Sequence, residues 1–480
     1  MGKYFGTDGF RGEANVTLTS DHAYRLGRIL GGYCRRRDLS RPDGEIPPHR
    51  PRIVVGKDTR RSSYMLEYAL AAGLAASGAD AYMLHVTTTP CVAFVTARED
   101  FDCGVMISAS HNPFTDNGIK LVNRLGEKID DDVIAVLEAY LDGEELPPPA
   151  TGAEIGRIVA HAAGRNRYVG HLIALAAHSY KGYRVGLDCA NGSAWMIGRA
   201  VFEALGAKTV VMGDAPDGLN INVNCGSTHI EGLRRLVLDH RLDVGFAFDG
   251  DADRLIAVDE KGNEVSGDHV LYLLGKAMKE QGSLTGNTVV TTVMSNMGLY
   301  AALADAGIDS VQTTVGDRFI YESMVENGFV IGGEQSGHII LRKYATTGDG
   351  LLTAIMVMER MVESKLPLSK LAEPVTLYPQ VTRNIPVTDK DAVLNHPAVA
   401  AKLADCNTRL GNGGRMLLRK SGTEPVVRVM VEATDGETCE AFAEEMVAVI
   451  REAGQSGYIG VFRGLCPRYP HLRTFLKKGS

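Results

Sequence analysis

Three stretches of the chain repeat one order of apolar and polar positions. Each begins with a short apolar run typical of a buried strand, passes through a polar or glycine-rich turn into an amphipathic run typical of a helix, and ends in a second apolar run. These stretches run from Arg52 to Leu84, from Arg184 to Met212 and from Thr288 to Thr313. Because strands that alternate with helices form parallel βαβ units, we predict three related α/β domains with mixed or parallel sheets.

The pattern changes after about residue 375. Two strand-like runs, Arg415–Arg419 and Val426–Val431, precede a helical run from about Glu437 to Glu452. This order predicts a smaller, antiparallel α+β domain at the C-terminal end.

Linker-like composition places the domain boundaries. A Pro-rich stretch begins at Leu146, and shorter polar stretches lie near residues 261 and 365. We therefore place the domains at residues 1–152, 153–263, 264–373 and 374–454, followed by a basic tail at 455–480. Residues 35–52, rich in Arg and Pro, are expected to form an exposed loop, and the tail to be solvated.

Composition excludes several classes of protein. The chain has 54 glycines in 480 residues, more than the average usage of roughly 7%, which favours many tight loops. A formal net charge of −7 argues against a protein that coats nucleic acid, and we expect no membrane span, since no apolar run approaches the roughly 18 residues that a span needs. The eight cysteines form no C-x-x-C pair, and the opening residues contain no apolar run typical of a signal peptide, so we expect a cytoplasmic location.

The clearest indication of a chemical function comes from residues 248–254, with the sequence Phe-Asp-Gly-Asp-Ala-Asp-Arg. Asp249, Asp251 and Asp253 occupy alternate positions, so in an extended segment they face the same way and can bind one hard cation. Mg²⁺ prefers a few carboxylates plus phosphate oxygen, which favours a Mg²⁺ site beside a phosphorylated group. Two alternatives stay open. A calcium EF-hand would need Gly in place of Arg254 and helical flanks, and an aspartyl phosphatase would use Asp249 as nucleophile.

Three further polar strings suit a phosphosugar. Ile107–Pro113 follows an apolar run and exposes Ser110 in a loop, where a phosphate would supply the oxygen that the metal site lacks. Gly333–His338 offers a carboxylate, a hydroxyl and an imidazole for sugar hydroxyls. Arg419–Pro425, with Arg428, combines cations, hydroxyls and backbone amides in the manner of a phosphate nest. Neither a P-loop nor a dinucleotide motif occurs.

These strings, together with the opening string Phe5–Gly12 and the domain plan, resemble the α-D-phosphohexomutase superfamily over about residues 3–454. Within the string Gly333–His338, which we call the sugar-binding string, Gln335 makes the chain similar to the bacterial branch that acts on glucosamine phosphates. Relatives that act on mannose or glucose phosphates usually have Met there.

The resemblance implies three α/β domains and a smaller fourth around a central active-site cleft. It also implies an isomerase that interconverts glucosamine 6-phosphate and glucosamine 1-phosphate through a phosphoserine and a 1,6-bisphosphate, for amino-sugar and cell-wall precursor synthesis. A mutase for mannose or glucose phosphates is the alternative. The expected partners are one Mg²⁺ ion per site and a phosphosugar, without nucleic acid or membrane, and a homodimer is allowed.

The same resemblance implies the roles of individual residues. Ser110 would carry the phosphoryl group and need phosphorylation for activity, and Lys120 would be the general acid and base. The full set comprises the catalytic residues Ser110, Lys120, Arg11 and His111, the metal ligands Ser110, Asp249, Asp251 and Asp253, and the substrate-binding residues Arg254, Glu334, Ser336, His338, Arg419, Ser421, Gly422, Thr423 and Arg428.

Overall fold

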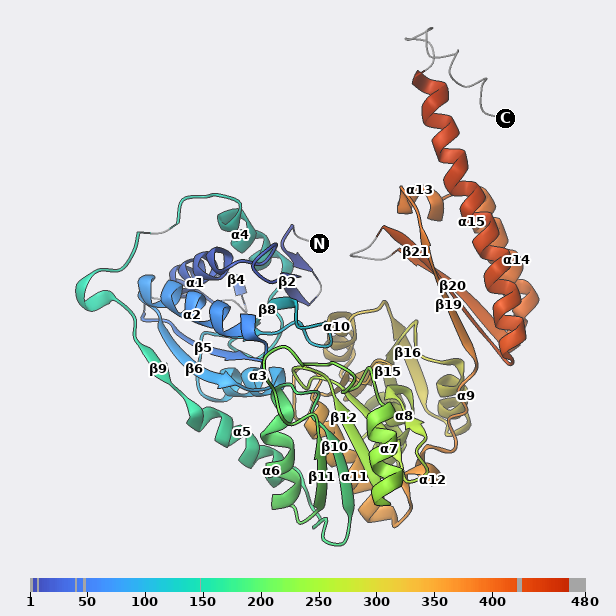
Figure 1. The fold of residues 1–480 in the computed structure, drawn as a ribbon, viewed down its shortest axis with the longest axis horizontal. Coiled ribbons are helices and arrows are strands. Elements are labelled where there is room, and N and C mark those ends of the chain that lie inside the picture. The colour runs from blue at the N-terminus through green and yellow to red at the C-terminus, as the bar shows by residue number, and fades with distance from the viewer. Residues whose placement is uncertain are drawn as a thin grey trace. The chain divides into compact units, whose positions relative to one another are not determined.

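The computed structural model describes residues 3–6, 8–38, 41–45, 49–146, 148–420 and 425–465, without the side chains of 41–45 and 454–465. The chain divides into two compact units, one of Met1–Ser295 with Ala301–Val375 and the other of Asn296–Tyr300 with Thr376–Ser480. Three sheets with their helices form the first unit, and a three-stranded sheet with helices forms the second (Figure 1). The prediction of three α/β domains and a smaller α+β domain is therefore confirmed.

The first domain is built on a seven-stranded mixed sheet. Its strands, in spatial order, are β1 (Phe5–Gly6), β2 (Gly9–Glu13), β8 (Asp116–Asn123), β7 (Cys103–Ile107), β5 (Arg52–Lys57), β6 (Asp80–Val86) and β9 (Ile158–Ala160). Strands β7, β5, β6 and β9 run parallel, whereas β8, β2 and β1 pair antiparallel. The helices are α1 (Ser20–Cys34), α2 (Arg61–Ala76), α3 (Thr89–Arg98) and α4 (Asp131–Leu141).

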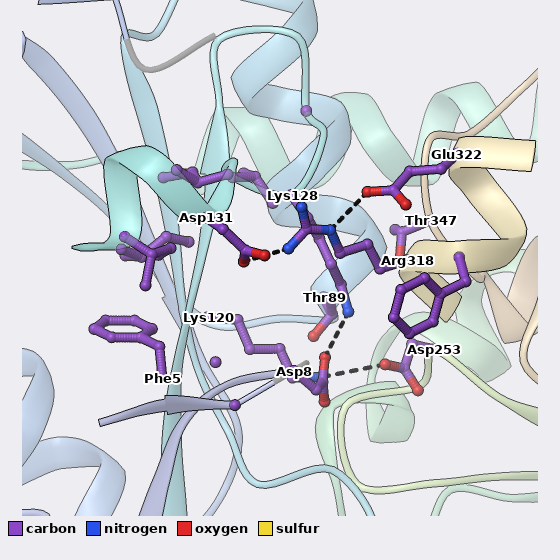
Figure 2. Close-up of a pocket in the computed structure, with 18 residues that line it drawn as sticks. Phe5, Asp8, Thr89, Lys120, Lys128, Asp131, Asp253, Arg318, Glu322 and Thr347 are labelled. Carbon is purple, nitrogen blue, oxygen red and sulfur yellow. Dashed lines mark hydrogen bonds and ion pairs between the residues drawn. The ribbon is translucent and has the colours of Figure 1, made fainter. Parts of the chain in front are cut away.

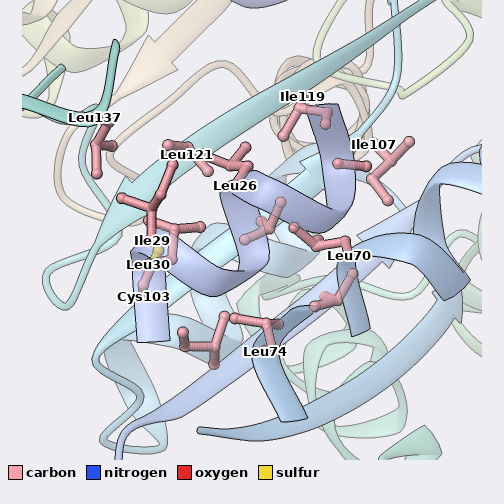
Figure 3. Close-up of a cluster of buried hydrophobic side chains, with 14 of the residues drawn as sticks. Leu26, Ile29, Leu30, Leu70, Leu74, Cys103, Ile107, Ile119, Leu121 and Leu137 are labelled. Atoms are coloured by element: carbon pink, nitrogen blue, oxygen red, sulfur yellow. The ribbon is translucent and has the colours of Figure 1, made fainter. Parts of the chain in front are cut away.

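Both faces of this sheet are buried. Ile53 and Val55 of β5 belong to the hydrophobic cluster that includes the inner faces of α1 and α2 (Figure 3). The other face of β5 packs on α3, where a Cβ added at Gly56 would lie 2.5 Å from Val92 Cγ2. Burial on both faces explains why β5 is continuously apolar rather than alternating.

Helices α1 and α2 approach each other closely through glycines. A Cβ at Gly27 of α1 would lie 2.4 Å from the carbonyl oxygen of Leu70, and one at Gly73 of α2 would lie 2.1 Å from that of Tyr24. Real Cβ atoms do not come this close to backbone, so the two helices need glycine at both positions.

The second and third domains each contain a parallel pair that comes from the predicted repeat. Strands β10 and β11 pair parallel, as do β15 and β16, each pair being joined through a helix. The second sheet has the order β11 (Lys208–Met212), β10 (Arg184–Asp188), β12 (Val244–Phe248), β13 (Leu255–Asp259) and β14 (Glu264–Val265), with helices α5 (Ala162–Leu175), α6 (Ile197–Ala204) and α7 (Glu231–His240). The third has the order β16 (Asp309–Thr313), β15 (Thr288–Thr292), β17 (Ile331–Gly333) and β18 (Ile339–Leu341), with helices α8 (Gly267–Glu280), α9 (Met297–Asp305), α10 (Asp317–Asn327), α11 (Gly350–Ser364) and α12 (Leu368–Ala372).

The sheet of the second unit is antiparallel throughout, as predicted, in the order β19–β21–β20. Its own hydrophobic cluster lies between the sheet and the helices. The elements are β19 (Gln380–Pro386), α13 (Lys390–Leu394), α14 (Pro397–Leu410), β20 (Gly414–Lys420), β21 (Val426–Ala433) and α15 (Gly436–Leu465).

Two segments differ from expectation. Within residues 35–52, predicted as a loop, β3 (Arg37–Asp38) and β4 (Arg41–Glu45) pair antiparallel, while 39–40 and 46–48 lie outside the described residues. The predicted tail starts as helix, because α15 continues to Leu465, and its later residues lie outside the described part. None of the described helices combines the length and apolar character that crossing a membrane requires.

The α1–α2 contact yields a test of the packing. Gly73→Ala is expected to lower the free energy of unfolding by about 1–3 kcal/mol, because overpacking outweighs the better helix propensity of Ala. Gly170→Ala in α5 is the matched control, since no atom lies within 4 Å of a Cβ there, and it should be neutral or stabilising. Urea titration of both variants measures the difference, and equal stability of the two would contradict the packing argument.

Candidate active site

Ser110 lies in a tight loop directly after β7, but its side chain is buried, so the prediction that the loop exposes it is wrong. Its φ of 52° is one that costs a non-glycine residue about 1–3 kcal/mol, so its surroundings must hold it there. Its N–H donates to Ser108 Oγ at 3.0 Å, and its carbonyl oxygen accepts hydrogen bonds from Arg60 Nη2 at 3.1 Å and Asn222 Nδ2 at 2.9 Å. Side chains of the first and second domains therefore hold this loop together.

Asp249, Asp251 and Asp253 lie in the turn between β12 and β13, and all three are buried. One carboxylate oxygen from each lies within 4.8 Å of the other two. Burial, together with the charges of Asp253 and Asp251, raises the pKa of Asp249 well above its ordinary value. Burial alone would also raise the pKa of Asp253, but Lys120 and His338 hold it well below the ordinary value.

The serine loop and the acidic turn touch each other. Ser110 Oγ donates a hydrogen bond to Asp249 Oδ2. Their backbones are also in contact, because a Cβ at Gly250 would lie 2.5 Å from the carbonyl oxygen of Ser110. The structure thus brings together the four residues proposed from sequence as metal ligands, and only glycine fits at position 250.

The acidic turn has the donors for a divalent cation. Asp251 Oδ1 and Asp253 Oδ1 are buried and accept no hydrogen bond. A buried carboxylate oxygen that accepts no hydrogen bond is costly, and a set of carboxylate and hydroxyl oxygens matches the ligands that Mg²⁺ prefers. The residues therefore fit a Mg²⁺ ion. The EF-hand alternative fails, because both flanks are strands that pair antiparallel rather than helices.

Lys120, on β8, is the central cation of the site. Its Nζ lies 2.9 Å from Asp251 Oδ2. It also lies 3.2 Å from Asp253 Oδ2 and 3.2 Å from Asp8 Oδ2 (Figure 2). Burial lowers the pKa of Lys120, but these three carboxylates raise it well above the ordinary value. The side chain is accordingly an ammonium that links the first and second domains.

Two arginines flank the same cluster. Arg11 pairs with Asp8, and its Nη1 donates to the carbonyl oxygen of Ala109 at 3.2 Å, beside Ser110. The backbone N–H of Arg254 donates to Asp249 Oδ1 at 3.2 Å. The side-chain Nε of Arg254 lies 3.8 Å from Asp253 Oδ1. Both guanidinium groups are therefore close to the serine loop or the acidic turn, where they add positive charge.

His111 follows Ser110 directly, and its Nδ1 lies 3.3 Å from Ser110 Oγ. Burial and the nearby charges of Arg254 and Arg11 lower the pKa of His111 to about 4. The imidazole is thus neutral at physiological pH, where it can hydrogen-bond to Ser110 but adds no charge.

The predicted sugar-binding string begins in β17 and runs into the loop before β18. Glu334 Oε2 accepts a hydrogen bond from Ser336 Oγ at 3.3 Å. His338 is buried, with Nδ1 3.7 Å from Asp253 Oδ1 and Nε2 3.4 Å from Asp317 Oδ2. Burial lowers the pKa of His338, but the two carboxylates raise it above the ordinary value. The string therefore contacts the acidic turn through His338.

A cavity of about 430 Å³ opens beside Lys120, which is large enough for a small-molecule ligand. The first and third domains both line it, with Asp8 and Lys120 from the first and Arg318 and Glu322 from the third (Figure 2). Asp253 reaches its wall from the second domain. Charged groups of three domains therefore converge on one cavity.

The predicted phosphate-binding string belongs to the second unit. Arg419, on β20, lies directly opposite Arg428 on β21, so the two side chains emerge from neighbouring strands. Ser421, Gly422 and Thr423 lie outside the described residues.

Sequence reasoning missed three contributors to the site: Asp8, Arg60 and Asn222. Asp8 stands in the opening string, in which only Arg11 had been given a role. The polar run that contains Arg60 directly follows the apolar strand β5, next to the strand that precedes Ser110. That position, at the carboxyl end of a neighbouring parallel strand, could have revealed Arg60.

Protein-family models match almost the whole chain. The matches are phosphoglucomutase/phosphomannomutase alpha/beta/alpha domain I at residues 2–147, domain II at 166–262, domain III at 266–378 and the C-terminal domain at 383–449. The solved structures with the same fold include a phosphoglucomutase/phosphomannomutase family protein from Burkholderia thailandensis, with a TM-score of 0.77 and 23% identity over 94% of this chain and 98% of that chain. An Aspergillus fumigatus N-acetylphosphoglucosamine mutase, solved with GlcNAc-6P and magnesium, has a TM-score of 0.62 and 17% identity over 94% of this chain and 96% of that chain.

Relatives found by sequence comparison have much higher sequence identity to the chain than these solved structures. Phosphoglucosamine mutase from Lachnospira eligens is 60% identical over 95% of this chain and 99% of that protein. Phosphoglucosamine mutase from Lachnoclostridium phytofermentans is 55% identical over the same shares. The resemblance found in the sequence is thereby confirmed, and the chain belongs to the phosphoglucomutase/phosphomannomutase family, among its phosphoglucosamine mutases.

Proposed function

We propose that the chain interconverts glucosamine 6-phosphate and glucosamine 1-phosphate, with phosphorylated Ser110 as donor and acceptor of the phosphoryl group. One observation carries the proposal: the Ser110 hydroxyl lies against the buried turn of Asp249, Asp251 and Asp253, at the place where charged groups of three domains converge. The relatives named phosphoglucosamine mutase support the choice of sugar.

In the first half-reaction, the sugar O1 attacks the phosphorus of phospho-Ser110 and the bond from phosphorus to Ser110 Oγ breaks. The Lys120 ammonium would give one proton to Ser110 Oγ as its bond to phosphorus breaks, and Lys120 would take up the proton that the sugar hydroxyl loses, so that it ends as an ammonium again. The second half-reaction is the reverse at O6, so that the 6-phosphoryl group of the 1,6-bisphosphate returns to Ser110. The proposal therefore needs the bisphosphate to turn over within the site.

Charge neutralisation supplies most of the catalysis in phosphoryl transfer. Asp249, Asp251, Asp253 and the Ser110 phosphate would hold Mg²⁺, which supplies charge stabilisation when bound. Arg11 adds fixed positive charge from the first domain, and Lys120 adds positive charge while it is protonated. His111, neutral because of its low pKa, is suited to orient the serine oxygen rather than to offset charge.

The remaining residues would hold the sugar and its other phosphate. Glu334, Ser336 and His338 offer groups for sugar hydroxyls, and Arg254 offers a guanidinium beside them. The phosphate that does not react would bind Arg419, Ser421, Gly422, Thr423 and Arg428. The homodimer that the resemblance allows stays a prediction. The cytoplasmic location is supported by the seven cysteines with described side chains, all of which are buried and unpaired.

The choice of sugar can be tested by comparing kcat/KM for glucosamine 6-phosphate with the values for mannose 6-phosphate and glucose 6-phosphate. Glucosamine 6-phosphate is expected to be preferred by at least about tenfold, a difference of roughly 1.4 kcal/mol in transition-state stabilisation. Equal or better turnover of the neutral sugars would favour a phosphomannomutase or phosphoglucomutase instead.

The metal proposal can be tested without an activity assay. Mg²⁺ is expected to raise the melting temperature of the EDTA-treated protein, because it binds the folded acidic turn and not the unfolded chain. Asp249→Asn should abolish most of this gain. Asp405→Asn is the matched control, since Asp405 is an exposed carboxylate that already pairs with Lys402 and Arg409. An equal loss of the gain in both variants would contradict the assignment.

A further inference from the structure

A loop of the first domain contacts the beginning of α10 in the third domain. We call residues 126–131 of the first domain and residues 317–321 of α10 the clasp. Three side-chain contacts join its two parts: Glu127 with Tyr321 at 2.7 Å, Lys128 with Asp317 at 2.7 Å, and Asp131 with Arg318. The last of these is drawn in Figure 2.

Lys128 differs from the other members of the clasp because it also contacts the catalytic cluster. Its Nζ lies 3.0 Å from Asp8 Oδ1, while the second oxygen of Asp8 lies 3.2 Å from Lys120 Nζ (Figure 2). Asp8 is thus shared between two ammonium groups. Burial would raise the pKa of Asp8, but Lys120 and Lys128 hold it well below the ordinary value. One end of the Lys128–Asp317 pair is therefore tied to Lys120.

The other end of the pair is tied to the sugar-binding string. Asp317 Oδ2 lies 3.4 Å from His338 Nε2. The residue before Asp317, Gly316, donates its backbone N–H to Glu334 Oε1 at 3.1 Å. The start of α10 therefore contacts both Glu334 and His338.

We propose that Lys128 and Asp317 form a positioning pair, which holds Glu334 and His338 of the third domain in register with Lys120 of the first. This inference rests on the proposed function of Lys120 and the sugar-binding string. The pair acts through Asp8, Gly316 and His338 rather than through chemistry of its own. A misplacement of about 1 Å between reacting groups costs up to about 100-fold in rate, so such a pair matters for turnover.

The pair can be tested with the variants Lys128→Met and Asp317→Asn in the full chain, assayed with glucosamine 6-phosphate. Each is expected to lower kcat by about 10- to 100-fold. KM should change by less than about threefold, because binding groups remain but are out of register with Lys120. Lys128→Arg should restore most of kcat. The double variant should be no slower than the slower single variant, since the residues act as a unit.

Tyr321→Phe is the matched control. It removes the contact with Glu127 in the same clasp but touches neither Asp8 nor His338, so kcat should stay within about twofold of the wild type. A loss as large as that of Lys128→Met would show that the clasp only holds the domains together. A change mainly in KM would show that Lys128, which also lines the cavity, binds the substrate directly. Either result overturns the positioning role.

Hydrogen exchange tests the same pair without any substrate, so failure of the proposed function would not obscure it. Lys128→Met and Asp317→Asn are expected to speed exchange in peptides that cover Gly316 and Glu334–His338 by at least about threefold. Tyr321→Phe should leave these peptides unchanged. Unchanged exchange in the two charge variants would overturn the proposal even if the wild type turned over no glucosamine phosphate.

Discussion

Three carboxylates that share one buried turn repel one another, and the active site is organised around that repulsion. A buried charge without a partner costs several kcal/mol, so Asp249, Asp251 and Asp253 need compensation. Lys120 comes from the first domain and His338 from the third, and both contact this turn of the second domain. The charges that stabilise the turn are thus the ones that bring the three domains together. A bound cation would complete the balance, using the oxygens that accept no hydrogen bond.

The same contacts require backbones to meet without side chains between them. Gly250 lets the acidic turn reach the carbonyl oxygen of Ser110, and Gly267 lets α8 reach that of Glu334, where a Cβ would lie 2.0 Å away. Gly337 needs glycine for two reasons. Its φ is 90°, and a Cβ would lie 2.1 Å from the carbonyl oxygen of Leu255. The high glycine content therefore has a specific use at the site. Gly250 and Gly337 allow segments of different domains to touch, and Gly267 allows two segments of the third domain to touch.

Much of the fold, and the role of the main polar strings in the site, could be predicted from the sequence. Both depend on patterns of neighbouring residues along the chain. The apolar runs, turns and helical periods of the three repeats are local signals, and so are the alternate aspartates after β12. The contacts of Lys128 could not be predicted, because Asp317 lies 189 positions away and only the packed domains bring the two together. Arg60 is an intermediate case: its position after a strand is readable, but its hydrogen bond to Ser110 depends on the neighbouring strand β7.

The central claim is that the phosphoryl group resides on Ser110 and passes to the sugar. A single-turnover chase tests it most directly: protein carrying radioactive phosphate is mixed with unlabelled glucosamine 6-phosphate and quenched at short times. The account predicts that label leaves Ser110 and appears in sugar bisphosphate and monophosphate, and that Ser110→Ala takes up no label. Label on Asp249 as a hydroxylamine-labile acyl phosphate, or label released as inorganic phosphate with none in the sugar, would contradict it.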